Sequence, residues 1–156
     1  MTGKSKQFSL AIVCVLCVTL LVSCTAKPFN TLEKFAKAYS DLDYNSMIEC
    51  VDPRVMDTLL DTLSLFSGNK TDRAAQLAVL SLCSDYMSHS AKAYWNEQGI
   101  SAKMTVQEIS TAIDGDKATV TAEFTISWSN GDVETWLDTV YMVRIDGKWY
   151  ITLSIF

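Results

Sequence analysis

The chain has 156 residues, of which 49% are apolar and 20% are charged, and it carries a formal net charge of −5. This composition is sufficient for one globular domain with a buried core, and it excludes a disordered or collagen-like chain. The acidic balance argues against a nucleic acid partner, because a phosphate backbone is bound by a basic surface.

The first 23 residues have the pattern of an export signal. Lys4 and Lys6 precede a run of fifteen uncharged residues from Phe8 to Val22. Such a run is shorter than the roughly 20 apolar residues that span a bilayer as a helix. We therefore predict a signal peptide over residues 1–23 and an extracytoplasmic location for the rest of the chain.

The apolar run ends in the sequence LVSC at residues 21–24, which resembles the bacterial lipobox. The resemblance implies that a diacylglyceryl group is attached to the nucleophilic thiol of Cys24 and that the chain is cleaved before this residue. Acyl chains such as palmitate would then anchor the protein at the extracytoplasmic face of the cell membrane, with residues 24–29 as a short linker. Ordinary secretion, with cleavage after Ala26, is the alternative.

Residues 30–156 are predicted to form a single domain that begins with helices. Apolar positions keep a helical period as far as Gly99, and residues that favour helix ends divide this segment. The predicted helices are residues 31–40 after a capping box of Asn30 and Glu33, a short helix after Asp43, a third from Pro53 after Asp52, and a fourth from Thr71 or Asp72 to Gln98. The fourth helix is expected to bury Leu77, Leu80, Cys83, Met87, Ala91, Tyr94 and Trp95.

After Gly99 the apolar period changes to two, which predicts strands near residues 102–113, 117–128, 133–145 and 148–155. Turns that contain glycine separate them, so we expect an antiparallel meander. A tight turn at Asn130 and Gly131 would pair Trp128 with Val133, and a bulged turn at Gly147 would pair Val143 with Trp149. In that register the buried side carries Val120, Ala122, Phe124, Ile126 and Trp128 beside Val133, Leu137, Thr139, Tyr141 and Val143.

Two stretches of this chain resemble a known superfamily. The run FAKAYSDLDYNSMIECVDPRVMDTL from Phe35 and the later segment VRIDGKWYI are similar to the nuclear transport factor 2-like superfamily of SnoaL-like or cystatin-like cones, and most of all to its small bacterial lipoproteins. The resemblance covers nearly all of residues 28–156. It implies an α+β fold in which N-terminal helices pack on the concave face of a curved four-stranded antiparallel meander, whose open end can hold a small ligand.

A cone of this kind makes several aromatic side chains candidates for ligand contacts. These candidates are Tyr39, Trp95, Phe124, Trp128, Tyr141 and Trp149. Aromatic residues at such positions are also typical of core packing, so both interpretations stay open. Some members of the superfamily use an inward carboxylate as a general base, but Glu123, Glu134 and Asp138 point outward in the predicted register and would stay solvated.

Asp85 and His89 are the catalytic candidates. They lie one turn apart on the fourth predicted helix, so the carboxylate could orient the imidazole. The same spacing is typical of a solvated helix face that has no part in catalysis. A catalytic role would also require a nucleophile or a substrate pocket beside the pair, and the sequence does not indicate one.

Two cysteines remain in the mature chain if Cys14 and Cys17 are removed with the signal peptide and Cys24 is lipidated. Cys50 and Cys83 could form a disulfide in an oxidising compartment, or they could be small apolar core residues. Two thiols and a distant His89 do not have the spacing of a structural zinc site, so we expect no metal and no cofactor.

The solvent side of the predicted sheet carries an apolar cluster of Trp136, Val140, Met142 and Tyr150, with Met142 opposite Tyr150. An exposed cluster of this kind suggests a homodimer or a protein partner that contacts Trp136, Met142 and Tyr150. Alternatively, the terminal loop or the N-terminal linker covers the cluster, or the register differs by one residue.

These observations predict a membrane-anchored extracytoplasmic lipoprotein whose domain is a non-enzymatic binding or interaction module. Its ligand would be a small apolar molecule or a protein partner. The alternative is a small-molecule isomerase or hydratase-like enzyme of the same cone fold, which would use Asp85 and His89 or a carboxylate that the predicted register misplaces.

Overall fold

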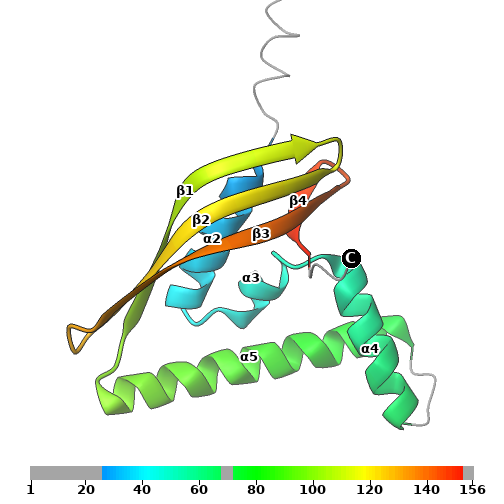
Figure 1. The fold of residues 1–156 in the computed structure, drawn as a ribbon. Coiled ribbons are helices and arrows are strands. Elements are labelled where there is room, and N and C mark those ends of the chain that lie inside the picture. The colour runs from blue at the N-terminus through cyan, green and yellow to red at the C-terminus, as the bar shows by residue number, and fades with distance from the viewer. Residues whose placement is uncertain (1–25, 68–71, 153–156) are drawn as a thin grey trace, which may run out of the picture.

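Figure 1 shows the computed structural model of the chain, which describes residues 26–67 and 72–152. The elements are α2 (Pro28–Ser40), α3 (Tyr44–Ile48), α4 (Pro53–Ser67), α5 (Arg73–Gln98), β1 (Ala102–Asp114), β2 (Lys117–Trp128), β3 (Val133–Ile145) and β4 (Lys148–Ile151). The predicted α+β class, with N-terminal helices followed by a four-stranded antiparallel meander, is confirmed. The predicted signal peptide, Cys24 and the end of the last predicted strand lie outside the described residues.

Two helices have their boundaries at residues that the sequence predicts. Asp43 caps α3, because its Oδ1 accepts a hydrogen bond from the backbone N–H of Ser46 over 3.1 Å. Asp72 caps α5 by accepting from the N–H of Ala74, and Gly99 ends that helix in the left-handed conformation at a φ of 66°. Glycine adopts this conformation without the steric cost of a Cβ atom.

The first described helix begins earlier than predicted. α2 starts at Pro28, and the preceding Lys27 makes no side-chain capping bond. Proline suits the first helical position, because its φ is already helical and its missing N–H would have had no partner there. Pro28 therefore takes the place of the predicted capping box of Asn30 and Glu33. The predicted start of α4 at Pro53 is confirmed.

The four strands form one antiparallel sheet in the order β1-β2-β3-β4. α2 lies across one face of this sheet, from β4 to the beginning of β1 (Figure 1). The hydroxyl of Thr31 donates to the carbonyl of Trp149 over 3.0 Å, and Oγ of Ser40 accepts from the N–H of Met104 over 2.8 Å. We call the face that α2 covers the helix side, and the opposite face the outer side.

The loop between β2 and β3 differs from the predicted tight turn. The N–H of Trp128 donates to the carbonyl of Asp132 over 2.8 Å, and Ser127 is the partner of Val133. The side chain of Asn130 holds this longer loop, because its Oδ1 accepts from the N–H of Asp132 over 3.0 Å. Asparagine commonly stabilises turns in this way. The predicted pairing of Trp128 with Val133 is therefore wrong by one residue.

The turn between β3 and β4 contains two residues and lacks the predicted bulge. Asp146 and Gly147 have φ values of 49° and 78°, which is the pattern of a type I′ turn. Arg144 is consequently opposite Trp149, and its guanidinium carbon lies 5.4 Å from the centre of the indole ring. This cation–π contact allows the charged Arg144 to lie beside the buried Trp149. A prediction based on the pattern of apolar residues alone misses this pairing.

The altered loop exchanges the two faces of β3 relative to the prediction. On the helix side, Trp136, Val140 and Met142 are the partners of Phe124, Val120 and Ala118. Met142 is 1% exposed, whereas Leu137 and Tyr141 on the outer side are 65% and 44% exposed. Because side chains alternate between the faces, a shift of one residue moves each of them to the other face. The predicted buried set on β3 is wrong, and the predicted outer cluster of Trp136, Met142 and Tyr150 does not form.

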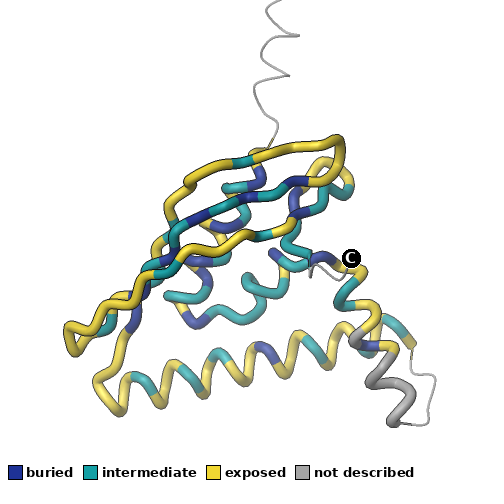
Figure 2. The backbone as a smooth tube through the Cα atoms, viewed as in Figure 1, coloured by how far each residue is buried: buried dark blue, intermediate teal, exposed yellow. Residues whose placement is uncertain are grey.

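The core lies between α2 and the helix side of the sheet. Leu32 of α2 packs with Val120 and Ala122 of β2, and all three are almost completely buried. Figure 2 shows that the buried positions are concentrated in α2 and β2, whereas α5 is mostly intermediate or exposed along its length. The sheet and α2 therefore form the stable centre of the domain, to which α3 and α5 are added.

α5 contacts the rest of the chain through one narrow face, which includes Ser88 and Trp95. Among the 26 residues of this helix, all of them described, Ser84 alone is buried. Oγ of Ser88 accepts a hydrogen bond from the N–H of Tyr44 in α3 over 3.0 Å. The predicted buried stripe is wrong in large part, because Leu77, Cys83, Met87 and Tyr94 are exposed. Ser88 makes the contact with α3, and the exposed Leu77, Met87 and Tyr94 lie outside it.

Candidate functional site

A groove of about 730 Å³ runs between α2 and the edge strand β1. Its lining includes Ala36, Lys37 and Ser40 of α2, residues 101–106 at the start of β1, and residues 127–129 at the end of β2. A hydrogen bond between residues far apart in the sequence positions these walls. Ser40 is the last residue of α2, and its hydroxyl reaches the backbone of Met104. The groove is therefore built where the end of one helix is hydrogen-bonded to a strand edge.

The backbone of β1 presents hydrogen-bonding groups to this groove. The N–H of Met104 donates to Ser40, so it points away from β2. Successive residues of an antiparallel strand direct their N–H and C=O groups to alternate sides. The backbone groups of Ala102 and Val106 therefore point to the same side as those of Met104. A strand edge with this arrangement can pair with another extended chain.

The regular part of this edge is short. A bulge between Glu108 and Ser110 shifts the pairing of β1 with β2. Bulges interrupt the ladder of backbone hydrogen bonds and increase the local twist of a strand. The stretch of β1 on which a second strand could pair in register therefore ends near Glu108, and this stretch coincides with the groove.

The charges around the groove have both signs. Nζ of Lys37 lies 2.6 Å from Oδ2 of Asp41, and this hydrogen bond to a carboxylate raises the pKa of Lys37. Glu33 and Lys103 complete the charged lining. Because the positive and negative groups balance, the groove does not favour a strongly charged ligand of either sign.

Two of the predicted pocket residues meet at one end of the groove. Trp128 lines the groove, and its ring centroid lies 6.0 Å from that of Trp95, with the ring planes tilted by 51°. This pair joins the C-terminal part of α5 to the end of β2. Trp95 and Trp128 are thus brought together by segments that are far apart in the sequence, and Trp128 is the member of the pair that lines the groove beside its serines.

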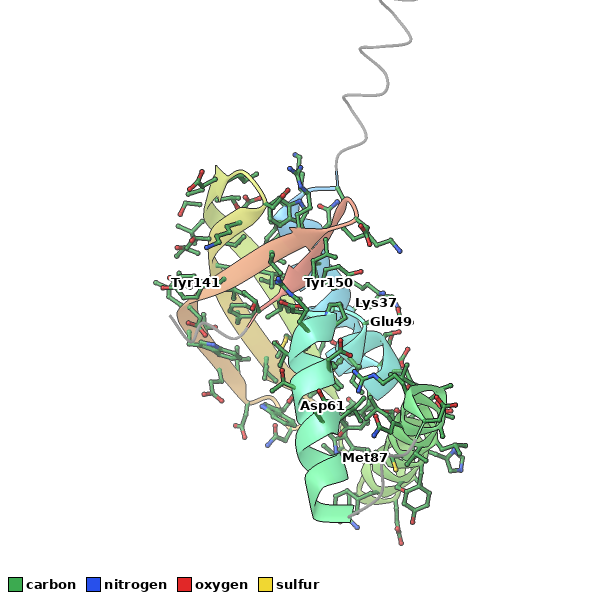
Figure 3. All side chains as sticks on the ribbon, turned by 90° about the vertical axis from the view of Figure 1, so that its right-hand side faces the viewer. Lys37, Glu49, Asp61, Met87, Tyr141 and Tyr150 are labelled. Carbon is green, nitrogen blue, oxygen red and sulfur yellow. The ribbon has the colours of Figure 1, made fainter. Side chains whose placement is uncertain are left out.

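The other predicted pocket residues lie elsewhere. Phe124 is in the core, and Tyr39 is half-buried on α2. Tyr141 lines a depression of about 400 Å³ near the start of α4, and Trp149 lines another of about 460 Å³ near the start of α2. Figure 3 shows Tyr141 on the side of the sheet away from α4 and α5. The six aromatic residues do not share one pocket.

The register of β3 also changes the position of two carboxylates. Glu134 and Asp138 are partners of Ile126 and Ala122 on the helix side, whereas Glu123 is on the outer side. The prediction that Glu134 and Asp138 point outward is therefore wrong. Both residues are nevertheless exposed. They lack the burial through which a carboxylate becomes a general base near neutral pH.

Asp85 lies in a contact between two helices, and His89 is on the surface of α5. The carboxylate of Asp85 accepts a hydrogen bond from the side-chain amide of Asn45, which ties α5 to α3. His89 is exposed one turn further along the helix. Neither residue lines any of the three depressions described above. The contact that the structure shows for Asp85 is one that holds two helices together.

Cys50 and Cys83 are both free thiols, with Cys50 buried and Cys83 exposed on α5. Burial raises the pKa of the Cys50 thiol. Within residues 26–67 and 72–152, no three or more histidine, cysteine, aspartate or glutamate side chains are grouped as metal ligands. In the same part of the chain, no helix has the length and the apolar character needed to cross a membrane.

A buried carboxylate lies at the start of α4. Asp52 is 2% exposed, and its Oδ2 lies 2.7 Å from Nη2 of Arg54. The hydrogen-bonded guanidinium of Arg54 lowers the pKa of Asp52. The N–H of Asp52 also donates to the carbonyl of Ile151 over 2.8 Å. The sequence identifies Asp52 as a helix cap, but not as the link between α4 and the end of β4.

The groove itself is not apparent in the sequence. Its central contact joins Ser40 to Met104, which are 64 residues apart. A serine at the end of a predicted helix and a long first strand are the only local signals, and neither specifies the other as its partner. Trp128 is the groove residue that sequence reasoning did single out.

Comparisons with known proteins add one structural likeness. No protein-family model and no curated protein matches this chain. A crystal structure described as that of an NTF2-like transpeptidase from Campylobacter jejuni is similar with a TM-score of 0.45 and 18% sequence identity. The alignment covers 83% of this chain and 100% of that protein.

Proposed function

We propose that this chain is a lipoprotein anchored through Cys24 at the extracytoplasmic face of the cell membrane, and that its domain is a non-enzymatic binding module. The ligand proposed for the groove between α2 and β1 is an extended segment of a protein partner. The observation that carries this proposal is the row of backbone groups of Ala102, Met104 and Val106 that faces the groove.

An extended peptide matches the chemistry of this groove. A peptide that adds a strand to a sheet edge gains affinity from main-chain hydrogen bonds and specificity from contacts of its side chains. Ala102 and Val106 supply such groups on either side of Met104, whose N–H is already bonded to Ser40. A small apolar ligand would instead favour a cavity lined mostly by apolar and aromatic side chains. Nine of the 14 residues that line this groove are serine, threonine or charged residues.

The proposed anchor would leave the groove accessible. A lipid on Cys24 would hold the start of α2 near the membrane, because α2 begins at Pro28. The groove lies at the other end of α2, around Ser40. A helix rises about 1.5 Å per residue, so the 13 residues of α2 separate the two ends by roughly 20 Å. The Ser40 end of the groove would therefore lie up to about 20 Å from the anchored end of α2.

The groove can be tested with a peptide probe. Processed protein made from the full chain is used to select binders from a phage-displayed library of random peptides, and one selected peptide is the probe. Ala102→Pro removes an N–H that faces the groove, and proline is tolerated where an edge strand directs its N–H outward. We expect its dissociation constant to rise about 3- to 10-fold, because one hydrogen bond contributes roughly 0.5–1.5 kcal/mol.

Ile113→Pro is the matched control for this experiment. Beyond the bulge, Ser110 is the partner of Thr121 and directs its backbone groups toward β2. Because these groups alternate along the strand, the N–H of Ile113 points away from β2, as that of Ala102 does. Ile113, however, lies outside the groove. Affinity for the peptide should be unchanged in this variant. An equal loss of affinity in both variants would show that the peptide does not bind in the groove. The same conclusion would follow if the peptide did not slow amide hydrogen exchange at residues 102–106.

The anchor requires a separate test. The full chain is produced in a bacterium that is supplied with labelled palmitate, and the purified protein is examined for the label. We expect Cys24→Ser to abolish labelling and Cys17→Ser to leave it unchanged, since Cys17 lies in the predicted signal peptide. An unlabelled protein whose N-terminus is Lys27 would show ordinary secretion instead.

A further inference from the structure

The groove beside β1 has different chemistry on the two sides of the sheet. β1 is an edge strand (Figure 1), and its side chains alternate between the helix side and the outer side. Ala102 is the partner of Trp128 on the helix side, whereas Lys103 is the partner of Ser127 on the outer side. A strand added beside β1 keeps this alternation. Neighbouring residues of a bound peptide therefore meet different surroundings.

On the helix side, the groove offers an apolar contact. Trp128 lines the groove, and Ala102 presents only a methyl group between this ring and a strand added at the edge. Side chains directly opposite each other on neighbouring strands have Cβ atoms about 4.5–5.5 Å apart. A large apolar or aromatic side chain opposite Ala102 can therefore extend across it to the ring of Trp128. A small side chain at this position would not reach the ring.

On the outer side, the groove offers a positive charge. Lys103 is exposed and forms no ion pair among the described residues, whereas Lys37 on the α2 wall is paired with Asp41. The backbone groups of Lys103 point toward β2, because those of the neighbouring Met104 point away from it. A residue opposite Lys103 on an antiparallel strand is then in a non-hydrogen-bonded pair, in which the side chains lie closest. An acidic side chain suits this position.

The other charges of the groove agree with this arrangement. Glu33 belongs to α2 and lies on the helix side, so the backbones of β1 and of an added strand separate it from a carboxylate on the outer side. Glu33 disfavours an acidic residue on the helix side, where an apolar one is expected. A peptide with one acidic residue next to one apolar residue therefore matches both sides.

Ser40 restricts where the peptide can pair. Its hydroxyl accepts from the N–H of Met104 over 2.8 Å, so this backbone group is already occupied. The free backbone groups on that side of β1 nearest to Trp128 are those of Ala102. The peptide residue that pairs with Ala102 through backbone hydrogen bonds is therefore also the residue whose side chain faces Trp128.

We infer, on the basis of the proposed peptide-binding function, that the groove selects an antiparallel extended segment in which an acidic residue precedes a large apolar or aromatic residue. The acidic residue lies opposite Lys103, and the apolar residue lies opposite Ala102 beside Trp128. The acidic residue comes first in the peptide because the two strands run in opposite directions. Peptides selected with the unmodified protein should contain this pair of residues.

An exchange of charge between the protein and the peptide tests this inference. Processed protein made from the full chain is the target, and one selected peptide is synthesised with Asp or with Lys at its acidic position. Lys103→Glu should weaken binding of the Asp peptide about 2- to 10-fold and strengthen binding of the Lys peptide by a similar factor. Lys148→Glu is the matched control, because it makes the same charge change at an exposed residue outside the groove. It should leave the order of the two affinities unchanged.

The apolar position has its own test. The same peptide is synthesised with Phe or Ser at the position next to its acidic residue. Trp128→Leu should reduce the preference for Phe over Ser and leave the preference for Asp over Lys unchanged. Circular dichroism checks that this variant is folded, because Trp128 also contacts Trp95. If it is not folded, the charge exchange at Lys103 decides the inference without it.

The proposed function and this specificity fail with different results. A peptide whose affinity is unaffected by Ala102→Pro does not bind in the groove, and both would then be overturned. A peptide that depends on Ala102 but prefers Asp over Lys equally in the unmodified protein and in Lys103→Glu would overturn the specificity alone. Selected peptides that lack an acidic residue before an apolar one would do the same.

Discussion

The indole ring of Trp136 stacks on the ring of Phe124, with the ring centroids 5.6 Å apart and the planes 14° from parallel. The two residues are direct partners on β3 and β2, on the helix side of the sheet. Aromatic pairs of this kind contribute about 0.5–1.5 kcal/mol beyond the burial of their area. The stacking therefore favours the register in which Trp136 faces the helices and Leu137 faces outward.

This register makes opposite predictions for two neighbouring residues. Met142→Ala should lower the free energy of unfolding by about 2–5 kcal/mol, because it leaves a cavity at a side chain that is 1% exposed. Tyr141→Ala on the outer side should cost about 1 kcal/mol or less. Urea denaturation of both variants measures the difference. A larger loss for Tyr141→Ala would indicate that β3 has the opposite face toward the core.

The ion pair of Asp52 and Arg54 predicts a specific acid sensitivity. Arg54 lowers the pKa of Asp52 below its unfolded value, so the unfolded chain binds the proton first as the pH falls. The stabilisation is complete above a pH of about 4 and is lost as the pH falls through the folded pKa. Asp52→Asn should reduce stability at neutral pH by about 1–2 kcal/mol and flatten the dependence on acid pH.

Asp146→Asn is the control for the acid-sensitivity measurement. It removes one carboxylate from the exposed turn between β3 and β4, and asparagine tolerates the positive φ of this position. Urea unfolding at a series of pH values should show the flattened acid profile only in Asp52→Asn. An identical profile in both variants would assign the effect to the general loss of one negative charge.

The two thiols should differ strongly in reactivity. Cys50 is 1% exposed, and its raised pKa lowers the fraction of thiolate, whereas Cys83 is exposed on α5. In the folded protein, a maleimide should label Cys83 rapidly and Cys50 only after unfolding. Peptide mass spectrometry identifies the labelled residue. Equal labelling of the two in the native protein would contradict the burial of Cys50.

The cap of α3 should contribute measurably to stability. Asp43 accepts hydrogen bonds from the N–H and the hydroxyl of Ser46 over 3.1 and 2.7 Å. Asp43→Ala should lower the free energy of unfolding by roughly 1 kcal/mol, whereas Asp43→Asn should retain most of the stability, because asparagine is an equally good cap. Thermal unfolding of the two variants distinguishes the cap from the charge. Equal losses would show that the negative charge matters more than the hydrogen bond.

Local chemistry within the sequence determined most element boundaries. Asp43, Pro53 and Asp72 mark helix starts because each satisfies or avoids a backbone N–H at that position. Gly99 marks a helix end because only glycine adopts the left-handed conformation without strain. The change of apolar period from helical to alternating then indicated the strands, and the glycine turns indicated an antiparallel meander. These signals extend over a few residues and are therefore present in the sequence.

Tertiary structure alone decided which face of β3 is buried and where the groove forms. The side chain of Asn130 selects a longer loop, and Arg144 is accommodated by the ring of Trp149, so both hairpins differ from the turns that apolar patterning favours. The groove depends on the contact between Ser40 and Met104. Local patterns could not specify these outcomes, because the contact of the groove joins residues 64 apart and each hairpin could close in more than one short turn that only the packing of β3 on the helices distinguishes.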